Sequence, residues 1–127
     1  MSRPVRVMTV DDQPMFREIA HELVGAMGGF EPVMEAASGP EALEAAERLH
    51  PELVLMDVRM PGMSGIETSR RLTARDASTV VVLVTSGECA DVSRAAQTCG
   101  AVALLAKQNL NPSVLQGIWA IHGPVAS

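Results

Sequence analysis

The sequence predicts an α/β fold in which a five-stranded parallel sheet is doubly wound, with helices on both of its faces. Strand-like runs alternate with helix-like runs five times along the 127 residues, as in chains that wind helices around a parallel sheet. The third and fourth strand runs are almost wholly apolar, which suits strands that are buried on both faces. Charged residues directly follow several of the strand runs, where ligands of such sheets bind.

The predicted strands cover residues 5–10, 32–36, 53–56, 79–84 and 102–105. Right-handed crossover connections favour a doubly wound sheet, and five such strands suit the spatial order 2-1-3-4-5. In this order the first and third strands are neighbours, and the chain changes direction between them. The residues that follow these two strands are therefore the first candidates for a functional site.

Helix signals separate the strands. Pro14 begins the first helix, which Gly28 and Gly29 end, and Ser38 with Glu41 matches a capping box for a second helix to about Leu49. A third helix covers residues 65–74, a weak fourth follows the fourth strand, and Asn111 and Pro112 begin the last. The predicted inward faces are Phe16, Ile19, Ala20, Leu23 and Met27; Ala42, Ala46 and Leu49; Val92, Ala95, Ala96 and Cys99; and Val114, Leu115, Ile118 and Ile121.

The composition excludes several classes of protein. With 47% apolar residues, the chain is expected to fold as one domain, residues 1–122, with a short tail at 123–127. The net charge of −5 argues against direct nucleic-acid binding by this domain. No apolar run approaches the ~18 residues of a membrane span, and no signal peptide is visible, so we expect a cytoplasmic protein without membrane contact. Cys89 and Cys99 lack metal-ligand spacing, and Cys99 is expected to be a core residue.

Three aspartates are expected to meet at one edge of the sheet. Asp11 and Asp12 follow the first strand, and Asp57 follows the third. Carboxylates held about 4 Å apart repel by about 4 kcal/mol per pair at an effective dielectric of 20. Such a cluster persists only with a counter-ion, and carboxylate oxygens select magnesium, calcium or manganese. The alternative for Asp11 and Asp12 is a solvated turn.

Lys107 is the only lysine of the chain and follows the fifth strand. Lysine presents a compact point charge, whereas arginine presents a wide planar fork. A tight pocket for a phosphoryl oxygen would require the compact charge. The alternative is a surface lysine without a role, but its position at a strand end, opposite the aspartates, favours a function.

Four motifs in this order and spacing resemble the receiver domain of two-component response regulators. They are Val10-Asp11-Asp12-Gln13-Pro14, the run 56–65 (MDVRMPGMSG), Val84-Thr85-Ser86, and Gly100-Ala101 followed after five residues by Lys107. The resemblance covers nearly the whole chain and implies the flavodoxin-like sheet order 2-1-3-4-5. A proline after the acidic pair and the lack of one after Lys107 are similar to receivers that carry a helix-turn-helix output domain.

The resemblance implies a role for each matching residue. Asp57 would accept a phosphoryl group and, with Asp12 and the backbone carbonyl of Arg59, bind Mg²⁺, with Mn²⁺ as an alternative; Asp11 would act largely through water. Lys107 and the Thr85 hydroxyl would bind phosphoryl oxygens. Such a domain is not an enzyme beyond its own phosphoryl transfer and hydrolysis. The alternative role for Thr85 is a strand-end cap or an ordinary residue of the strand pairing.

The resemblance also implies partners. A sensor histidine kinase or a phosphotransfer protein would supply the phosphoryl group. A homodimer and a DNA-binding output domain outside this chain, active in transcriptional regulation, stay open. Trp119 lies at the edge of the apolar stripe of the last helix and could anchor such an interface or fold over the edge of the core.

Three other classes fit less well. A phosphatase of the haloacid dehalogenase type needs a second carboxylate two residues after the nucleophile, where this chain has Arg59. A flavodoxin-like nucleotide binder needs a Gly-rich or hydroxyl-rich loop after the first strand. A degenerate receiver that serves only as an interaction module would not need the acidic pair, the nucleophile and the lysine, which are all present.

The chain departs from the usual receiver pattern at two positions. Leu104 stands where most members have Tyr or Phe, so we expect a switch that starts at Thr85 and does not depend on a rotating ring. Gln108 stands where many members have a cis proline. Arg59 and Gly87 occupy two variable positions that are thought to set the lifetime of the phosphoryl group, and we expect Arg59 to lengthen it.

Overall fold

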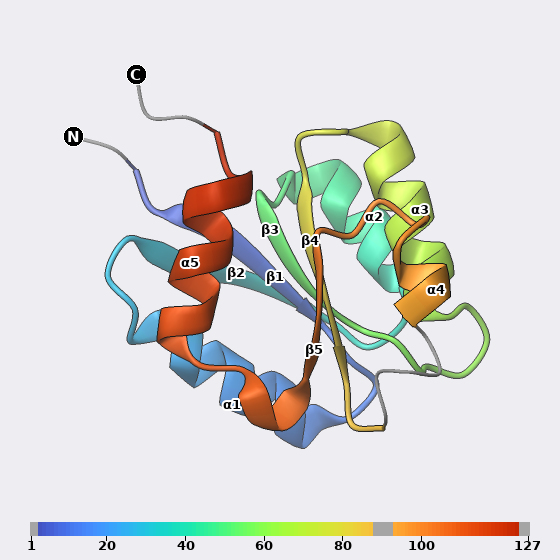
Figure 1. Cartoon of the computed structure of the whole chain (residues 1–127), viewed down its shortest axis with the longest axis horizontal. Coiled ribbons are helices and arrows are strands. Elements are labelled where there is room, and N and C mark those ends of the chain that lie inside the picture. The colour runs from blue at the N-terminus through green and yellow to red at the C-terminus, as the bar shows by residue number, and fades with distance from the viewer. Residues whose placement is uncertain (1–2, 88–92, 125–127) are drawn as a thin grey trace.

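A five-stranded parallel sheet forms the centre of the computed structural model, which describes residues 3–87 and 93–124. The strand order is β2-β1-β3-β4-β5 (Figure 1). The strands are β1 Val5–Val10, β2 Phe30–Ala36, β3 Leu53–Asp57, β4 Val80–Thr85 and β5 Ala103–Ala106. The predicted doubly wound α/β fold with the order 2-1-3-4-5 is therefore confirmed.

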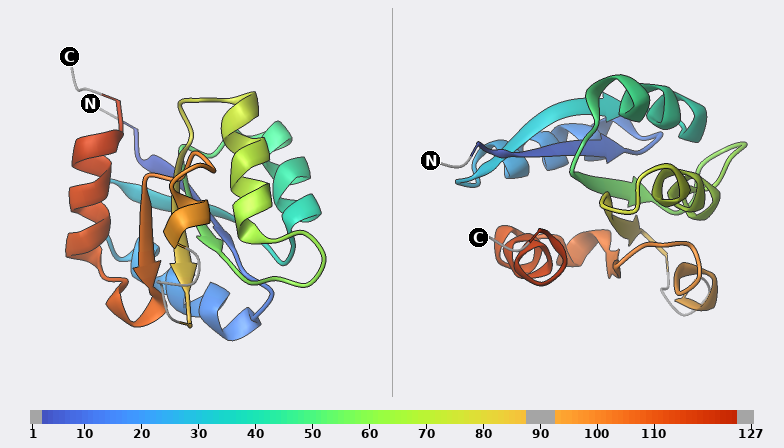
Figure 2. Two further views of the ribbon diagram at one scale, coloured as in Figure 1. Left: turned by 45° about the vertical axis from the view of Figure 1, so that its right-hand side comes forward. Right: turned by 90° about the horizontal axis from the view of Figure 1, so that it is seen from above.

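Helices cover both faces of the sheet, as the two views in Figure 2 show. They are α1 Pro14–Gly25, α2 Gly39–Leu49, α3 Gly65–Arg75, α4 Ser93–Ala96 and α5 Pro112–His122, with a 3₁₀ turn at Lys107–Asn109. Helices α1 and α5 pack against one face, and α2, α3 and α4 against the other. No helix in residues 3–87 and 93–124 is long and apolar enough to cross a membrane.

Successive strand residues serve the two helical layers in turn, because side chains alternate between the faces of a sheet. Val7 and Leu53 face α1 and α5, while Met8 and Val54 face the opposite layer. This explains why the central strands are apolar along their whole length. All five residues of β3 and all six of β4 are buried.

The predicted caps of the second and last helices are confirmed. The Ser38 hydroxyl accepts a hydrogen bond from the backbone N–H of Glu41 at 3.2 Å. The Asn111 side-chain oxygen accepts one from the N–H of Val114 at 2.9 Å. Both bonds satisfy a backbone donor that the helix itself leaves without an acceptor.

The second strand is longer than predicted. It begins at Phe30 and contains Pro32, which lacks a backbone N–H. A proline fits there because β2 is an edge strand. The pairing of β1 with β2 shifts register between Val7 and Met8, at the level of this proline.

The predictions that Ile19 and Ile121 lie in the core are wrong, because the buried stripes of α1 and α5 are narrower than their apolar stripes. Ile19 is 52% exposed and Ile121 is 77% exposed. At about 100° per residue, Ile19 lies about 90° from the centre of the buried stripe of α1. Ile121 lies about 120° from the buried stripe of α5, where Trp119 packs inward instead.

The predicted faces of α2 and α4 need smaller corrections. In α2 the buried side chains include Leu43 and Ala45, while Ala46 and Leu49 are only half-buried. Leu49 is the last helical residue, and the chain leaves the helix at His50 in the left-handed conformation, with φ 48°.

In and after α4, Cys99 is a core residue as predicted, and Ala96 is buried beside it, but Ala95 is exposed. Val92 and Cys89 lie outside the described residues.

Strand register brings four polar residues to one edge of the sheet. Val10 pairs with Met56, and the next residues along the two neighbouring strands are Asp11 and Asp57, which therefore lie side by side. Asp57 pairs with Val84, and Thr85 pairs with Ala106, the residue before Lys107. The carboxyl ends of four strands therefore present these side chains together.

Candidate functional site

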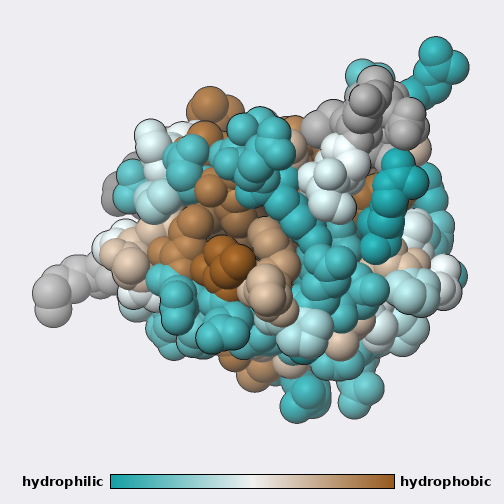
Figure 3. Space-filling view, turned by 90° about the horizontal axis from the view of Figure 1, so that it is seen from below, coloured by the Kyte–Doolittle hydropathy of each residue, from teal (hydrophilic) through white to brown (hydrophobic). Residues whose placement is uncertain are grey.

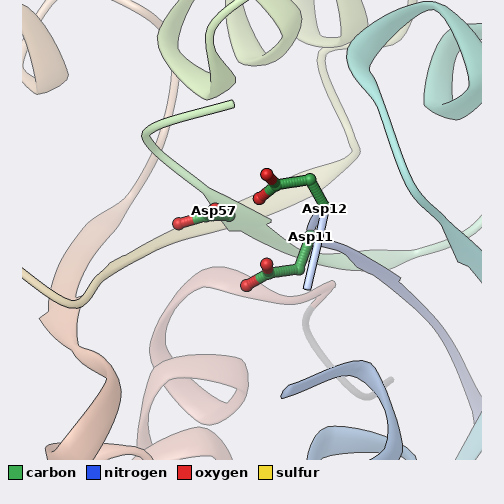
Figure 4. A group of neighbouring side chains, drawn as sticks. All are labelled: Asp11, Asp12 and Asp57. Atoms are coloured by element: carbon green, nitrogen blue, oxygen red, sulfur yellow. The ribbon is translucent and has the colours of Figure 1, made fainter. Parts of the chain in front are cut away.

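Three carboxylates converge at this edge of the sheet. Asp11, Asp12 and Asp57 each offer an oxygen within 4.8 Å of the others. Figure 4 shows that all three side chains project to the same side, two from the end of β1 and one from the end of β3. Asp11 and Asp57 are buried, whereas Asp12 is exposed. The cluster that the sequence predicts is present.

Hydrogen bonds hold the loop that carries the acidic pair. The backbone N–H of Asp11 donates to the Ala36 carbonyl at 3.0 Å, which ties the loop to β2. The N–H of Gln13 donates to the Asp11 carboxylate at 2.8 Å. The guanidinium of Arg17 donates to the Asp11 carbonyl at 2.7 Å. The backbone of Asp11 is thus tied to β2 and α1, and its carboxylate is held by Gln13 of the same loop.

The loop after Asp57 is packed closely against the end of β3. The N–H of Gly65 donates to the Val58 carbonyl at 2.9 Å. A Cβ at Gly65 would overlap the backbone carbonyl of Asp57, so only glycine fits at this close approach. Ser64 caps α3 by accepting from the N–H of Glu67 at 3.1 Å. The first turn of α3 therefore fixes the backbone of Asp57.

Lys107 provides the positive charge of the site. Its Nζ lies 2.6 Å from Oδ2 of Asp11 and 3.7 Å from Oδ1 of Asp57. Its side chain is only 14% exposed. The lone lysine of the chain is therefore not a solvated surface residue but lies between the two buried carboxylates.

The surroundings of Asp57 disfavour the ionised form of its carboxyl group. Its pKa is raised from 3.8 to about 6, chiefly by burial and then by the neighbouring charge of Asp11, with a smaller contribution from Asp12. Lys107 and a hydrogen bond from the backbone N–H of Arg59 act in the opposite direction and lower this pKa. One lysine does not balance three carboxylates.

The donor set fits a hard divalent cation. Asp11 Oδ2 is fully buried and accepts no hydrogen bond from the described residues, although Lys107 lies beside it. Oxygen atoms from carboxylates at this spacing are what Mg²⁺ and Mn²⁺ prefer. A bound cation would offset the repulsion among the three carboxylates, which contributes to the raised pKa of Asp57.

Thr85 lies beside the site at the end of β4, and Leu104 lies two residue pairs earlier in the neighbouring strand β5. Thr85 ends β4, is 1% exposed, and its hydroxyl oxygen accepts a hydrogen bond from the N–H of Gly87 at 3.1 Å. Leu104 pairs with Leu83 in the sheet and packs half-buried on the face that α4 covers. Beside Leu104 the surface has a hollow of about 240 Å³, which Ala96 also lines.

Arg59 and Gly87 face each other across the mouth of the site. Arg59 Nε and Nη2 lie 3.7 and 3.9 Å from the point that a Cβ on residue 87 would occupy. The same point is 3.8 Å from the Thr85 hydroxyl oxygen. The arginine arm therefore reaches from the β3–α3 loop to the end of β4, where it lies beside Gly87.

Residues 7–118 match the family described as response regulator receiver domain. The chain belongs to this family. The resemblance that the four motifs carry is thereby confirmed. The acidic cluster lies at the carboxyl ends of β1 and β3.

Curated relatives of the receiver domain include enzymes and transcription factors. A protein-glutamate methylesterase/protein-glutamine glutaminase of Myxococcus xanthus is 41% identical over 82% of this chain and 30% of its own length. The transcriptional activator ExaE of Pseudomonas putida is 38% identical over 88% of this chain and 52% of its own length. This chain thus spans about a third to a half of these two relatives.

Solved structures agree. A signal receiver domain from Mycobacterium tuberculosis superimposes with a TM-score of 0.83 at 31% identity, covering 95% of this chain and 98% of that one. A LuxR-family response regulator from Aurantimonas gives the same TM-score and identity, covering 93% and 84%. Chemotaxis protein CheY4 of Vibrio cholerae, at 24% identity and TM-score 0.79, shares the fold.

Trp119 lies away from the acidic site of the receiver domain. It is half-buried, and its ring meets that of Phe30 edge to face, with centroids 6.4 Å apart and an interplanar angle of 74°. The tryptophan thus closes the core between α5 and the start of β2. An interface role for Trp119 stays a prediction.

Sequence reasoning missed two residues that touch the site from α1. Arg17 bonds the Asp11 carbonyl, and Phe16 places its ring 4.5 Å from Lys107 Nζ. Phe16 was expected only as a core residue, and Arg17 was not singled out. The available signal was their position in the first turn of the helix that follows the acidic pair.

Proposed function

We propose that this receiver domain accepts a phosphoryl group on Asp57 in the presence of Mg²⁺ and passes the signal to a partner or output surface. The observation that carries the proposal is the meeting of Asp11, Asp12 and Asp57 within 4.8 Å, with the ammonium of Lys107 between two of them. Nucleophile, cation ligands and a compact positive charge are thus side by side.

The reaction is an in-line displacement at phosphorus. An oxygen of the ionised Asp57 carboxylate attacks the phosphorus of a phosphohistidine, the P–N bond breaks, and the imidazole nitrogen leaves with the electron pair. Lys107 moves from Asp11 towards the oxygens of the transferred group, which need a compact cation. The hydroxyl of Thr85, which is buried at the end of the neighbouring strand, donates a hydrogen bond to another of these oxygens.

Asp12, Asp57 and the carbonyl of Arg59 would hold the cation directly, and Asp11 would hold it largely through water. A bound divalent ion neutralises charge that develops on the phosphoryl oxygens. Arg59 stands where a turnover phosphatase would carry its second carboxylate. The domain thus acts as an acceptor and not as an enzyme of steady turnover.

The phosphodonor would be a sensor histidine kinase or a phosphotransfer protein that docks beside Asp57. Helix α1, which directly follows the acidic pair, exposes Met15 at 74% and Ile19 at 52%. Figure 3 views this end of the molecule and shows apolar surface next to hydrophilic surface. Exposed apolar residues beside a site that must be approached closely suit a protein partner.

We take residues 1–122 as the receiver unit, which would act on an output domain outside it or through a surface of its own. ExaE is a transcriptional activator, and the Aurantimonas relative is of the LuxR family. A DNA-binding output domain joined to this receiver, and a homodimer through α5 near Trp119, are therefore the responses we propose. Trp119 fluorescence that changes neither with phosphorylation nor with protein concentration would count against the role of α5.

Acetyl phosphate provides the direct test. Wild-type protein incubated with acetyl phosphate and Mg²⁺ should gain the mass of one phosphoryl group, and EDTA should prevent this. Asp57→Asn keeps the shape of the side chain and should gain none, while Asp12→Asn should need far more Mg²⁺. A label that persists in Asp57→Asn would refute the assignment of the acceptor.

A further inference from the structure

Phe16 contacts both the hydrophobic core and Lys107 of the charged site. It lies in the first turn of α1, is 8% exposed, and packs in the core cluster that contains Leu55 and Val84. The Nζ of Lys107 lies over the face of its ring, 4.5 Å from the centroid. An aromatic face carries negative potential, so a cation placed there is attracted to it.

The Phe16 ring gives the Lys107 ammonium a third contact, in addition to its contacts with the carboxylates of Asp11 and Asp57. Asp11 and Asp57 approach Nζ at 2.6 and 3.7 Å. Lysine has a flexible four-carbon stem, so these two contacts alone do not fix where its charge sits. With the ring as a further contact, the ammonium is confined between both carboxylates and close to Asp57.

We propose that Phe16 is a positioning residue for phosphoryl transfer, which holds Lys107 Nζ beside Asp57 through a cation–π contact. This rests on the proposed function of Asp57 as acceptor. Phe16 touches no reacting atom and acts through Lys107. Its removal should therefore slow the transfer step and leave Mg²⁺ binding at Asp12 and Asp57 nearly unchanged.

The variants must separate positioning from core packing. Phe16→Leu removes the aromatic face, and Phe16→Tyr keeps it. Phe30→Leu is the matched control, because Phe30 packs against the same core cluster next to Trp119 and away from Lys107. It should lower stability without touching the site. If Phe16→Leu does not fold, Phe16→Met keeps more of the volume and still lacks the ring.

The first measurement is the rate of phosphorylation by acetyl phosphate at saturating Mg²⁺, with the Mg²⁺ dissociation constant measured separately. Phe16→Leu should be about fivefold slower, within the range expected for a largely desolvated cation–π contact, with a Mg²⁺ dissociation constant within about twofold of wild type. Phe16→Tyr should match wild type. Equal rates in Phe16→Leu and wild type, or equal slowing in Phe30→Leu, would overturn the proposal.

The second measurement does not depend on phosphorylation. Because Lys107 is the only lysine, selective isotope labelling of lysine gives one set of side-chain NMR signals. The ring current of Phe16 should shift the ε-methylene signal upfield in wild type and Phe16→Tyr, and this shift should be absent in Phe16→Leu. An unchanged signal would refute the contact itself. A wild-type protein that accepts no phosphoryl group would instead refute the proposed function.

Discussion

Arg59 extends across the site into the space beside Gly87, with its Nε 3.7 Å from the point that a Cβ on that residue would occupy. We expect a guanidinium there to screen the acyl phosphate and to obstruct the path of an in-line water. Arg59→Ala should therefore lose its phosphoryl group several times faster than wild type. The measurement is the decay of phosphorylated protein after removal of the donor.

The control for this prediction is Arg75→Ala, at the far end of α3, which should decay like wild type. A bulky residue at position 87 should displace the arginine arm and act like its removal, so Gly87→Tyr should also shorten the lifetime. Identical decay of Arg59→Ala and wild type would contradict the idea.

Stability in the absence of metal should depend on pH through Asp57. Its pKa is about 6 in the folded protein, compared with 3.8 for an aspartate side chain in the unfolded chain. Between these values the folded state binds more protons than the unfolded state, so the free energy of unfolding falls as pH rises from about 4 to about 6. Since one pH unit corresponds to about 1.4 kcal/mol, this loss is at most about 3 kcal/mol.

Urea unfolding in EDTA at a series of pH values would measure this. Asp57→Asn should lose this part of the pH dependence and be more stable than wild type at pH 7. Mg²⁺ at pH 7 should stabilise wild type, because it neutralises the carboxylates. The explanation fails if Asp57→Asn and wild type show the same slope between pH 4 and 6.

Arg17 should matter for metal binding. Its bond to the Asp11 carbonyl, at 2.7 Å, and its contact with Glu35 on β2, at 3.4 Å, fix the loop that carries Asp12. Charge-assisted hydrogen bonds are worth about 1.5–3 kcal/mol, so Arg17→Met should weaken Mg²⁺ binding about tenfold. Isothermal titration calorimetry would report the change.

Arg6 offers a matched control for Arg17. Its guanidinium donates to the His50 carbonyl at 3.1 Å, at the opposite end of the sheet. Arg6→Met thus removes a bond of the same type and should leave Mg²⁺ affinity unchanged. Equal loss of affinity in both variants would mean that Arg17 acts through stability alone.

The conformational response should depend on Thr85 more than on Leu104. Shifting a population from 1:99 to 99:1 needs about 5.5 kcal/mol, and a half-buried leucine without a hydroxyl biases two states weakly. Thr85→Ala should still be phosphorylated but lose the NMR shifts that phosphorylation causes in α4 and β5. Leu104→Ala should keep them and lose about 1–2 kcal/mol of stability, less than a fully buried leucine would. The reverse pattern would contradict this account.

The fold could be predicted because its signals are local. Apolar strands, capping residues such as Ser38 and Asn111, and the spacing of Asp11, Asp12 and Asp57 are visible in the chain. Which side of an apolar helix is buried is not local. Ile19 and Ile121 were misplaced because the buried stripe depends on how the helix sits against the sheet, and Phe16 and Arg17 were missed as site residues because their partners come from other elements.

The two described ends of the chain, residues 3 and 124, lie at the amino-terminal ends of the strands, opposite the end that carries the carboxylates (Figure 1). A strand of six residues such as β4 spans about 20 Å at about 3.3 Å per residue. A domain that continues directly from either end would therefore begin on the side of the sheet away from Asp57. From that side it would respond to the phosphoryl group through movement relayed along β4, β5 and α5.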